Sequence, residues 1–376
     1  MKASPIVRLE SLDILRGFDL FCLVFFQPIL ITLSGVVNTP WMTEIAKPFE
    51  HVAWEGFAFW DIIMPLFLFM AGVSMPFAFS KYMDNNSKST IYKRVLKRVL
   101  LLWIFGMMCQ GNLLGLNLDK IFLYSNTLQA IAMGYLISAL LLMNFKLKGQ
   151  IITTSLLLLI SWALLTFVKI GEWGGGNFSP DNNLAEYIDR VVLGRFRAGV
   201  TFSSEGLDFG EYRYTWILSS LNFGVTVMTG VFAGHIMKTS VKSIKKVGWL
   251  VAVGVSMIIV GKLWGLQMPI IKKIWTSSMT LYSSGICFLL MALFFYLIDH
   301  KKYIKGFGWL KIYGMNSIMA YMLYTIINFA CITQSLFFGM EQYLGNYYVV
   351  LLQFGNVSIV FLILWFMHRN KIFLKI

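Results

Sequence analysis

Charge is scarce in this sequence. Asp, Glu, Lys and Arg make up only 13% of its 376 residues, which is about half of their share in an average soluble domain. Hydrophobic residues make up 57%, and they recur in long runs from one end of the chain to the other. This composition excludes a disordered chain and a small secreted protein held by disulfides. It also argues against a soluble globular domain.

Cysteine is scarce as well, and the common catalytic motifs are missing. The four cysteines, Cys22, Cys109, Cys287 and Cys331, stand in apolar runs without paired spacing, so we expect packing residues and no metal ligands or disulfides. A phosphate-binding glycine loop, a zinc-protease motif and a nucleophile-elbow serine are all missing. The sequence is therefore not typical of an ATPase, a zinc protease or a redox enzyme.

The long apolar runs are what the sequence has in abundance. A bilayer-spanning helix takes about 20 apolar residues, and ten runs reach that length. We predict an all-α polytopic membrane protein of about ten transmembrane helices in a single domain over residues 1–376. The predicted spans centre on 14–37, 57–80, 95–115, 122–144, 150–170, 215–238, 247–267, 276–298, 311–337 and 347–367.

The basic residues predict the orientation. The two ends of the chain and the loops on their side hold 22 of the 32 Lys and Arg residues, and positive charge is retained in the cytoplasm. We therefore expect both termini to be cytoplasmic, in a bacterial cytoplasmic membrane because no organelle-targeting extension precedes the first span. The net charge of +14 is therefore mostly a signal of topology. Nucleic acid is the weaker explanation, because the basic residues are spread over six short pieces; these pieces can also hold anionic lipid or a phosphorylated cosubstrate.

One long polar stretch, at about 171–214, separates two apolar runs on the outer side. It holds seven of the 18 acidic residues together with glycine-rich and proline-containing turns. A loop of this length is often a functional lid. A plain connector over the outer face is the competing interpretation.

The first span carries unusual polar residues. Asp13 and Arg16 stand one helical turn apart and can pair near the cytoplasmic surface, whereas Asp19 lies deeper and needs a partner. Gln27 follows 11 residues after Arg16, roughly 16 Å along a helix and past mid-membrane. A buried glutamine is more often a helix–helix contact than a catalytic group.

The entrance to the second span holds His51, Trp54 and Glu55, with Asp61 following. The first three share one face if a helix already begins at His51. Histidine titrates near neutral pH, and a carboxylate such as Asp61 can orient the imidazole. His51 is therefore a candidate general base or acyl acceptor. Trp54 fits an interfacial belt better than a substrate platform.

Two more polar groups lie at predicted outer helix ends. Asn126 and Gln129 open the fourth span; they either cap and join helices or bind a sugar or an amide. Lys272 and Lys273 precede the eighth span against the general charge bias. This basic pair either meets an acidic substrate or is solvated.

The order of these pieces resembles the heparan-alpha-glucosaminide N-acetyltransferase family, of the transmembrane acyltransferase superfamily, as a bacterial member. The most specific motif is His51-x-x-Trp54-x-Gly56 followed by Asp61-x-x-x-Pro65. The other matching stretches are RLESLDILRG from Arg8 to Gly17, TLQAIA from Thr127 to Ala132, the segment 269–278 with its KKIWTSS core, and GMNS from Gly314 to Ser317.

The resemblance implies transfer of acetyl from cytoplasmic acetyl-CoA to the amino group of a glucosamine-type, heparan-like sugar beyond the membrane. His51 takes the position of the family's active histidine, and Gln27 takes the place of an asparagine in the first helix. The implied assembly is a homodimer, without a metal.

Among the remaining candidates, Arg16, Lys97 and Arg98 are our first guesses for nucleotide contacts. Trp54, Glu55, Asn126, Gln129 and Lys272 are the guesses for substrate contacts. Gln27 donating to the thioester carbonyl and Asp61 orienting His51 complete the catalytic set.

The residues leave several questions open. His51 either deprotonates the acceptor amine or takes the acetyl group itself. The acceptor could instead be a hydroxyl group of an extracytoplasmic glycan. A transporter of a small polar or acidic solute, lined by Asp19, Gln27, His51 and Asp61, is the alternative from a different class.

Overall fold

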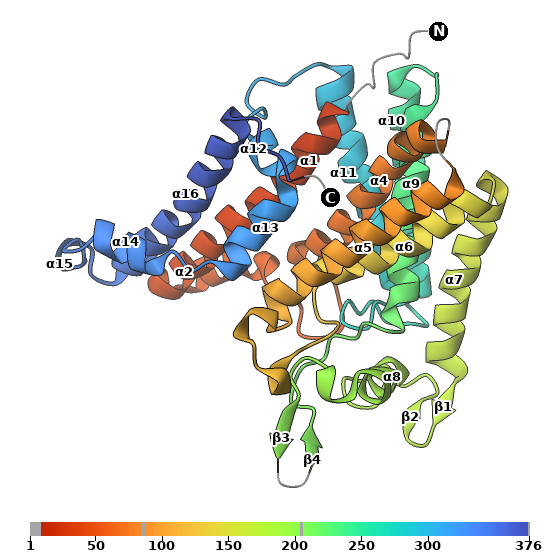
Figure 1. Cartoon of the computed structure of the whole chain (residues 1–376), viewed down its shortest axis with the longest axis horizontal. Helices are drawn as coiled ribbons and strands as arrows, with labels where there is room; N and C mark the ends of the chain where they lie inside the picture. The colour runs from red at the N-terminus through yellow and green to blue at the C-terminus, as the bar shows by residue number, and fades with distance from the viewer. Residues whose placement is uncertain (1–8, 84–86, 204–205, 375–376) are drawn as a thin grey trace. The chain divides into compact units, whose positions relative to one another are not determined.

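A computed structural model describes residues 9–83, 87–203 and 206–374, and helices dominate it (Figure 1). The described strands are four short ones, paired as two antiparallel hairpins. The predicted all-α class is confirmed. By its internal contacts the chain divides into two compact units: a first unit of Met1–Phe49, Ser240–Ala252 and Leu289–Lys375, and a second unit of Glu50–Thr239 and Val253–Phe288.

Most predicted spans correspond to a membrane-length helix. Within the described residues, eight helical segments are long and apolar enough to cross a bilayer, and a bent pair makes up to nine. The run predicted at 95–115 is also helical. The first half of its helix holds Lys93, Arg94, Lys97 and Arg98, so the helix carries too much charge to be counted among the apolar, membrane-length helices. The eight are Glu10–Val37, Phe59–Ser80, Thr127–Asn144, Leu147–Phe167, Ser219–Lys238, Ser243–Trp264, Ser277–His300 and Glu341–Arg369.

The first unit is built around the N-terminal span and the C-terminal helices. A π-helical turn, Cys22–Phe26, joins the two halves of the first span, and another, Phe295–His300, ends α11. The helices that belong to it wholly or in part are α1 (Glu10–Phe21), α2 (Gln27–Val37), α3 (Pro40–Ala46), α10 (Ser243–Trp264), α11 (Ser277–Phe294), α12 (Leu310–Met315), α13 (Ser317–Ile326), α14 (Ala330–Leu336), α15 (Glu341–Leu344) and α16 (Tyr348–Arg369).

Helices α1 and α12 touch backbone to backbone. A Cβ atom added to Gly17 would lie 1.9 Å from the carbonyl oxygen of Leu310, and one added to Gly314 would lie 1.9 Å from that of Asp13. Such small residues allow close packing where no hydrophobic effect drives helices together in lipid. Asp13 and Arg16 pair at 3.9 Å as predicted. Asp19 is buried, and its carboxylate oxygens have no hydrogen-bond partner among the described residues.

The second unit contains a bundle in which α4, α6 and α9 pack on one another, with α5 beside α6 (Figure 1). Its further elements, besides parts of α10 and α11, include four 3₁₀ turns, of which Phe59–Ile62 opens the second span. Its helices and strands are α4 (Ile63–Met83), α5 (Lys88–Gln110), α6 (Thr127–Asn144), α7 (Leu147–Phe167), β1 (Lys169–Ile170), β2 (Trp173–Gly174), α8 (Leu184–Leu193), β3 (Thr201–Ser203), β4 (Gly206–Asp208) and α9 (Ser219–Lys238).

The closest approach in this bundle is between α4 and α9. A Cβ atom on Gly230 would lie 2.0 Å from the Phe69 carbonyl oxygen, and one on Gly72 would lie 1.9 Å from that of Val227. These are backbone atoms, so no side chain can move aside. The two helices would have to separate to admit a methyl group.

We therefore expect Gly230→Ala to destabilise the protein by about 2 kcal/mol or more, as overpacking does in tight interiors. Thermal unfolding in detergent measures the effect. Gly248→Ala is the matched control, because a Cβ atom at this position in α10 meets no atom within 4 Å. Equal melting temperatures for the two variants would contradict the packing described here.

The stretch predicted as a long loop is folded. Apart from residues 204 and 205, which lie outside the described part, it carries β2, α8 and the β3–β4 hairpin. The guanidinium of Arg197, fully buried, donates to the Glu186 carboxylate and to the Tyr212 carbonyl oxygen. Asp189 accepts from the backbone N–H groups of Trp216 and Ile217, while burial raises its pKa to about 7. Buried polar groups thus tie this region to the start of α9.

Candidate active site

The segment before the second span is extended. The backbone of Glu55 pairs in antiparallel fashion with Ile271, and the Gly56 N–H donates to the Ile270 carbonyl at 2.9 Å. The condition under which His51, Trp54 and Glu55 would share a helical face is not met, because residues 51–58 form bends and one antiparallel bridge and no helix. Helical structure begins only at Phe59, so Asp61 lies in the first turn of the span.

The segment 269–278 is the partner of this extended stretch, and side chains hold its shape. Thr276 and Ser278 donate their hydroxyls to the Pro269 carbonyl at 2.9 and 3.1 Å. Trp275 has a φ of +47°, which costs energy for a residue with a Cβ, and its carbonyl accepts from Asn222 at 2.7 Å. These bonds fix the position of Lys272.

His51, Asp61 and Lys272 meet between these two segments. The Nδ1 atom of His51 lies 2.7 Å from Asp61 Oδ1. The Nζ atom of Lys272 lies 3.2 Å from His51 Nδ1 and 3.4 Å from Asp61 Oδ1. The side chains of Asp61 and Lys272 are only 1% and 5% exposed, whereas that of His51 is 43% exposed. The accessible imidazole of His51 is therefore in contact with two buried side chains of opposite charge.

The Asp61 contacts favour one tautomer of His51. Asp61 Oδ2 accepts from the Ala58 N–H at 2.9 Å, which fixes the carboxylate and leaves Oδ1 for the imidazole. If Nδ1 carries the hydrogen and donates it to Oδ1, Nε2 has a free lone pair. If Nδ1 instead accepts from Lys272, Nε2 carries the hydrogen and cannot act as a base. The shorter contact to the carboxylate supports the first arrangement.

Lys272 is paired and not solvated, so that part of the sequence interpretation is wrong. Burial lowers the pKa of its ammonium group to about 8, although the Asp61 carboxylate acts in the opposite direction. Below that pH the cation balances the carboxylate. The resting charge of the three side chains is then zero when the imidazole is neutral.

Trp54 and Glu55 flank this arrangement. The Trp54 indole N–H donates to the Phe178 carbonyl at 2.8 Å, so the extended stretch is tied to the folded region that follows α7. The Nζ atom of Lys273 lies 5.9 Å from the ring centres of both Trp54 and Tyr214. Glu55 is exposed, and among the described residues only its backbone makes a hydrogen-bonded pairing, with Ile271.

Asn126 and Gln129 form a buried cap at the start of α6. The Asn126 side-chain oxygen accepts from the Leu128 N–H, and Gln129 Oε1 accepts from the N–H groups of Ser125 and Asn126. The capping alternative for this pair is confirmed. Substrate contact by either side chain stays a prediction.

The remaining predicted residues are divided between the units. In the first unit, the Gln27 amide donates to the Phe49 carbonyl at 3.2 Å, and Arg16 pairs with Asp13 as described. In the second unit, Lys97 is exposed, while the Arg98 guanidinium lies 4.4 Å from the Tyr135 ring centre. The Arg98 Nε atom makes no hydrogen bond within the described residues.

Tyr214 is a neighbour of the site that the sequence interpretation missed. Burial, and secondarily the Asp61 charge, raises its pKa to about 12. Aromatic residues occupy every second position here, and the Tyr214 ring contacts the rings of both Tyr212 and Trp216. The alternation was visible in the sequence, but nothing there linked it to position 61. Among the described residues no cluster of His, Cys, Asp and Glu suits a metal ion.

Comparisons with known proteins point to the same family as the motifs. The family model described as "Heparan-alpha-glucosaminide N-acetyltransferase, catalytic" matches residues 8–176. The chain is 26% identical to the heparan-alpha-glucosaminide N-acetyltransferase of Homo sapiens, over 84% of this chain and 52% of that protein. It is 25% identical to that of Mus musculus, over 87% of this chain and 54% of that protein.

The chain thus spans about half the length of the curated relatives it matches. The matched region contains the His51 motif and Asp61, and the alignments extend over most of the chain. The resemblance noted from the sequence is confirmed: residues 8–176 match the family's catalytic model, and most of the chain is similar to the two heparan-alpha-glucosaminide N-acetyltransferases.

Proposed function

We propose that this protein transfers acetyl from cytoplasmic acetyl-CoA to the amino group of a glucosamine-type sugar on the other side of the membrane. The observation that carries the proposal is the accessible His51 imidazole with its Nδ1 atom 2.7 Å from a buried carboxylate. This pairing suits a base or nucleophile at Nε2. The chemistry that the family name describes needs such a group.

In a direct route, the neutral amine attacks the thioester carbonyl carbon while His51 Nε2 takes the amine proton. The C–N bond forms, the C–S bond breaks, and the imidazolium returns the proton to the departing CoA thiolate. The positive charge that develops on the ring is stabilised by Asp61. Lys272 opposes that charge, which favours return of the proton.

In a covalent route, Nε2 itself attacks the thioester carbon and the CoA thiolate leaves. The amine then attacks the acetyl carbon, the bond to Nε2 breaks, and the proton of the amine passes to the thiolate or to water. The same hydrogen bond to Asp61 holds the ring in both routes. Detection of acetyl on His51 in quenched reactions distinguishes them.

Further roles are proposed from the resemblance and from residue chemistry. Gln27 would donate to the thioester oxygen as charge develops there. Arg16, Lys97 and Arg98 would bind the phosphates of CoA.

The acceptor sugar would be bound by Trp54, Glu55, Asn126, Gln129 and Lys272. Both termini would be cytoplasmic, in a bacterial inner membrane, with lipid around the spans and a second copy completing a homodimer.

Purified protein in detergent tests the activity itself. We expect free CoA to appear when acetyl-CoA and glucosamine are both present, with N-acetylglucosamine as the product. Mass spectrometry before and after hydroxylamine treatment separates an amide from an ester, which identifies an O-acetyltransferase. No turnover without a sealed membrane, together with solute uptake into vesicles, would support the transporter instead.

Lys272 provides a test by pH. Without the lysine charge, the Asp61 carboxylate stabilises the imidazolium with no neighbouring cation to oppose it. For Lys272→Met we expect the acidic limb of the pH profile of kcat/KM to move up by about one pH unit. Lys272→Arg keeps the charge and should leave the limb in place. A limb that stays unmoved in Lys272→Met would show that Lys272 does not act on His51.

A further inference from the structure

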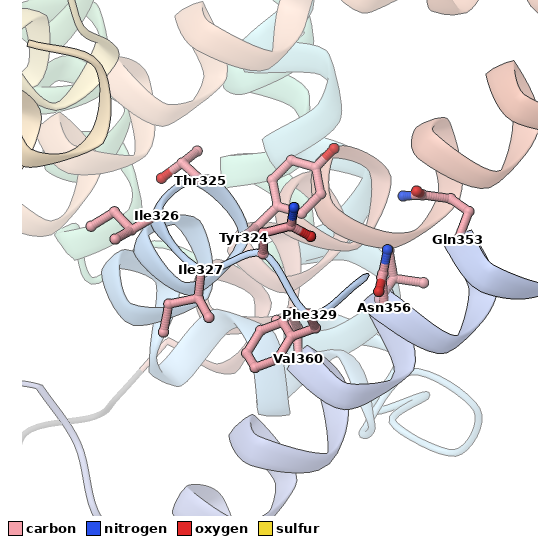
Figure 2. Close-up of a pocket in the computed structure, with 10 residues that line it drawn as sticks. Tyr324, Thr325, Ile326, Ile327, Phe329, Gln353, Asn356 and Val360 are labelled. Carbon is pink, nitrogen blue, oxygen red and sulfur yellow. The ribbon is translucent and has the colours of Figure 1, made fainter. Parts of the chain in front are cut away.

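The first unit contains a cavity where a transmembrane helix is broken. Helices α13 and α14 meet at an angle of 77°, with Ile327, Asn328 and Phe329 between them. The cavity has a volume of about 340 Å³ and lies between this break and α16, as Figure 2 shows. Gln353 and Asn356 of α16 line it on one side, and Tyr324 and Phe329 on the other.

The break lies at membrane depth. Asn356 follows the start of α16 by eight residues and precedes its end by thirteen, which corresponds to about 12 Å and about 20 Å at the rise of an α-helix. Irregular backbone at such depth is tolerated where it is buried in protein or lines a polar cavity. The cavity is therefore a site within the membrane span where irregular backbone and polar side chains are lined by protein.

The end of α13 offers free acceptors to this space. Its last backbone bond runs from the Ile327 N–H to Leu323. Within the described residues no backbone N–H donates to the carbonyls of Tyr324, Thr325 or Ile326. Unpaired carbonyls and the negative end of the helix dipole favour a ligand that donates hydrogen bonds.

Side chains add both donors and acceptors. Asn356 accepts from Thr333 at 2.9 Å and keeps its amide N–H₂, and the Gln353 amide makes no hydrogen bond with any described residue. The lining also holds Thr325, whose hydroxyl donates to the Tyr321 carbonyl, and Asn328, whose side-chain oxygen accepts from the Ala330 N–H. The other lining residues are apolar or aromatic, including Val357 and Val360. No Asp, Glu, Lys, Arg or His lines the cavity.

We propose that this cavity binds an uncharged, hydroxyl-bearing ring of sugar size. Hydroxyl groups can donate to the helix-end carbonyls and accept from the amides, while the C–H face of a ring packs on Tyr324 and Phe329. The volume falls in the range of small-molecule sites and is much larger than a metal ion needs. A pure hydrocarbon would leave the amides and carbonyls unpaired.

Saturation-transfer NMR on the full chain in lipid nanodiscs, with methyl β-glucoside as the probe, tests this site. The probe has no amine, so it is not an acceptor in the proposed acetyl transfer, and the two proposals can fail separately. We expect saturation to reach the ring protons of the probe in the presence of protein and not with empty nanodiscs. No transfer to the probe, or equal transfer with empty nanodiscs, overturns the proposal and leaves lipid or water as the occupant.

Two variants locate the binding. Gln353→Leu removes an unbonded amide, so we expect the affinity for the probe to fall by about tenfold or more. Gln334→Leu makes the same exchange at an exposed position of α14 outside the cavity and should bind as the parent does. Thr325→Trp, from an exposed position at the cavity, should block binding if Gln353→Leu fails to fold. Unchanged affinity in the folded cavity variants contradicts the assignment.

Discussion

His51→Ala should reduce the rate of CoA release from acetyl-CoA and glucosamine by about 10³-fold or more. The imidazole is the only group of the three that is accessible, and in both routes its Nε2 atom handles the proton or the acetyl group. The fold should persist, because Asp61 and Lys272 remain as a balanced pair with their oxygen and nitrogen atoms 3.4 Å apart. Thermal unfolding and CoA binding should therefore be close to those of the parent.

The control for this variant is His368→Ala, which removes a partly buried histidine from the last turn of α16. It should retain the parent rate. Added imidazole should restore part of the rate to His51→Ala, since the vacated space lies at an accessible position. A folded His51→Ala protein with normal turnover would remove His51 from the reaction.

Asp61→Asn should reduce turnover by about 10²-fold to 10⁴-fold, the range found when an oriented histidine loses its carboxylate. The amide keeps the size of the side chain but no longer stabilises an imidazolium. It can also donate to Nδ1, which moves the hydrogen to Nε2 and removes the base. KM for acetyl-CoA should change much less than kcat.

The same variant should be less stable, because it leaves Lys272 buried without its counter-charge. The pKa of Lys272 is already lowered in the folded protein, and loss of Asp61 lowers it further, so folding releases a proton. Stability of Asp61→Asn should therefore rise with pH up to about 10.5, the pKa of an unfolded lysine. Unfolding measured between pH 6 and 10 checks this sign.

A double variant separates stability from chemistry. Asp61→Asn with Lys272→Met removes both buried charges, so it should recover the stability and lose the pH dependence while remaining slow. Recovery of turnover in the double variant would mean that Asp61 only neutralises Lys272 and does not orient His51.

Part of this site was visible in the sequence. His51 and Asp61 stand ten residues apart in one motif, and a histidine beside a carboxylate at a membrane boundary is an expensive arrangement. Lys272, 221 residues from His51, was noticed because it opposes the charge bias. Its contact with the pair depends on the strand-like pairing of Glu55 with Ile271, which no local pattern predicts.

The same limit explains the other differences. No helix begins at His51, so the condition under which His51, Trp54 and Glu55 would share a face is not met; the bridge between Glu55 and Ile271 takes its place. The sequence predicts a long polar loop after α7 and does not show its order, because that order depends on buried contacts between residues from different turns, such as that of Arg197 with Glu186. Most membrane spans, by contrast, can be predicted from the sequence, because a helix surrounded by lipid needs a long apolar run whatever its tertiary contacts are.

Reconstituted vesicles show whether the acetyl group crosses the membrane. Acetyl-CoA is enclosed inside, glucosamine is supplied only outside, and N-acetylglucosamine is measured in the external medium. We expect external product to accumulate with the parent protein while CoA stays inside, and His51→Ala to give about 10³-fold less product or lower. Product formed only when both substrates are on the same side would contradict transfer across the membrane.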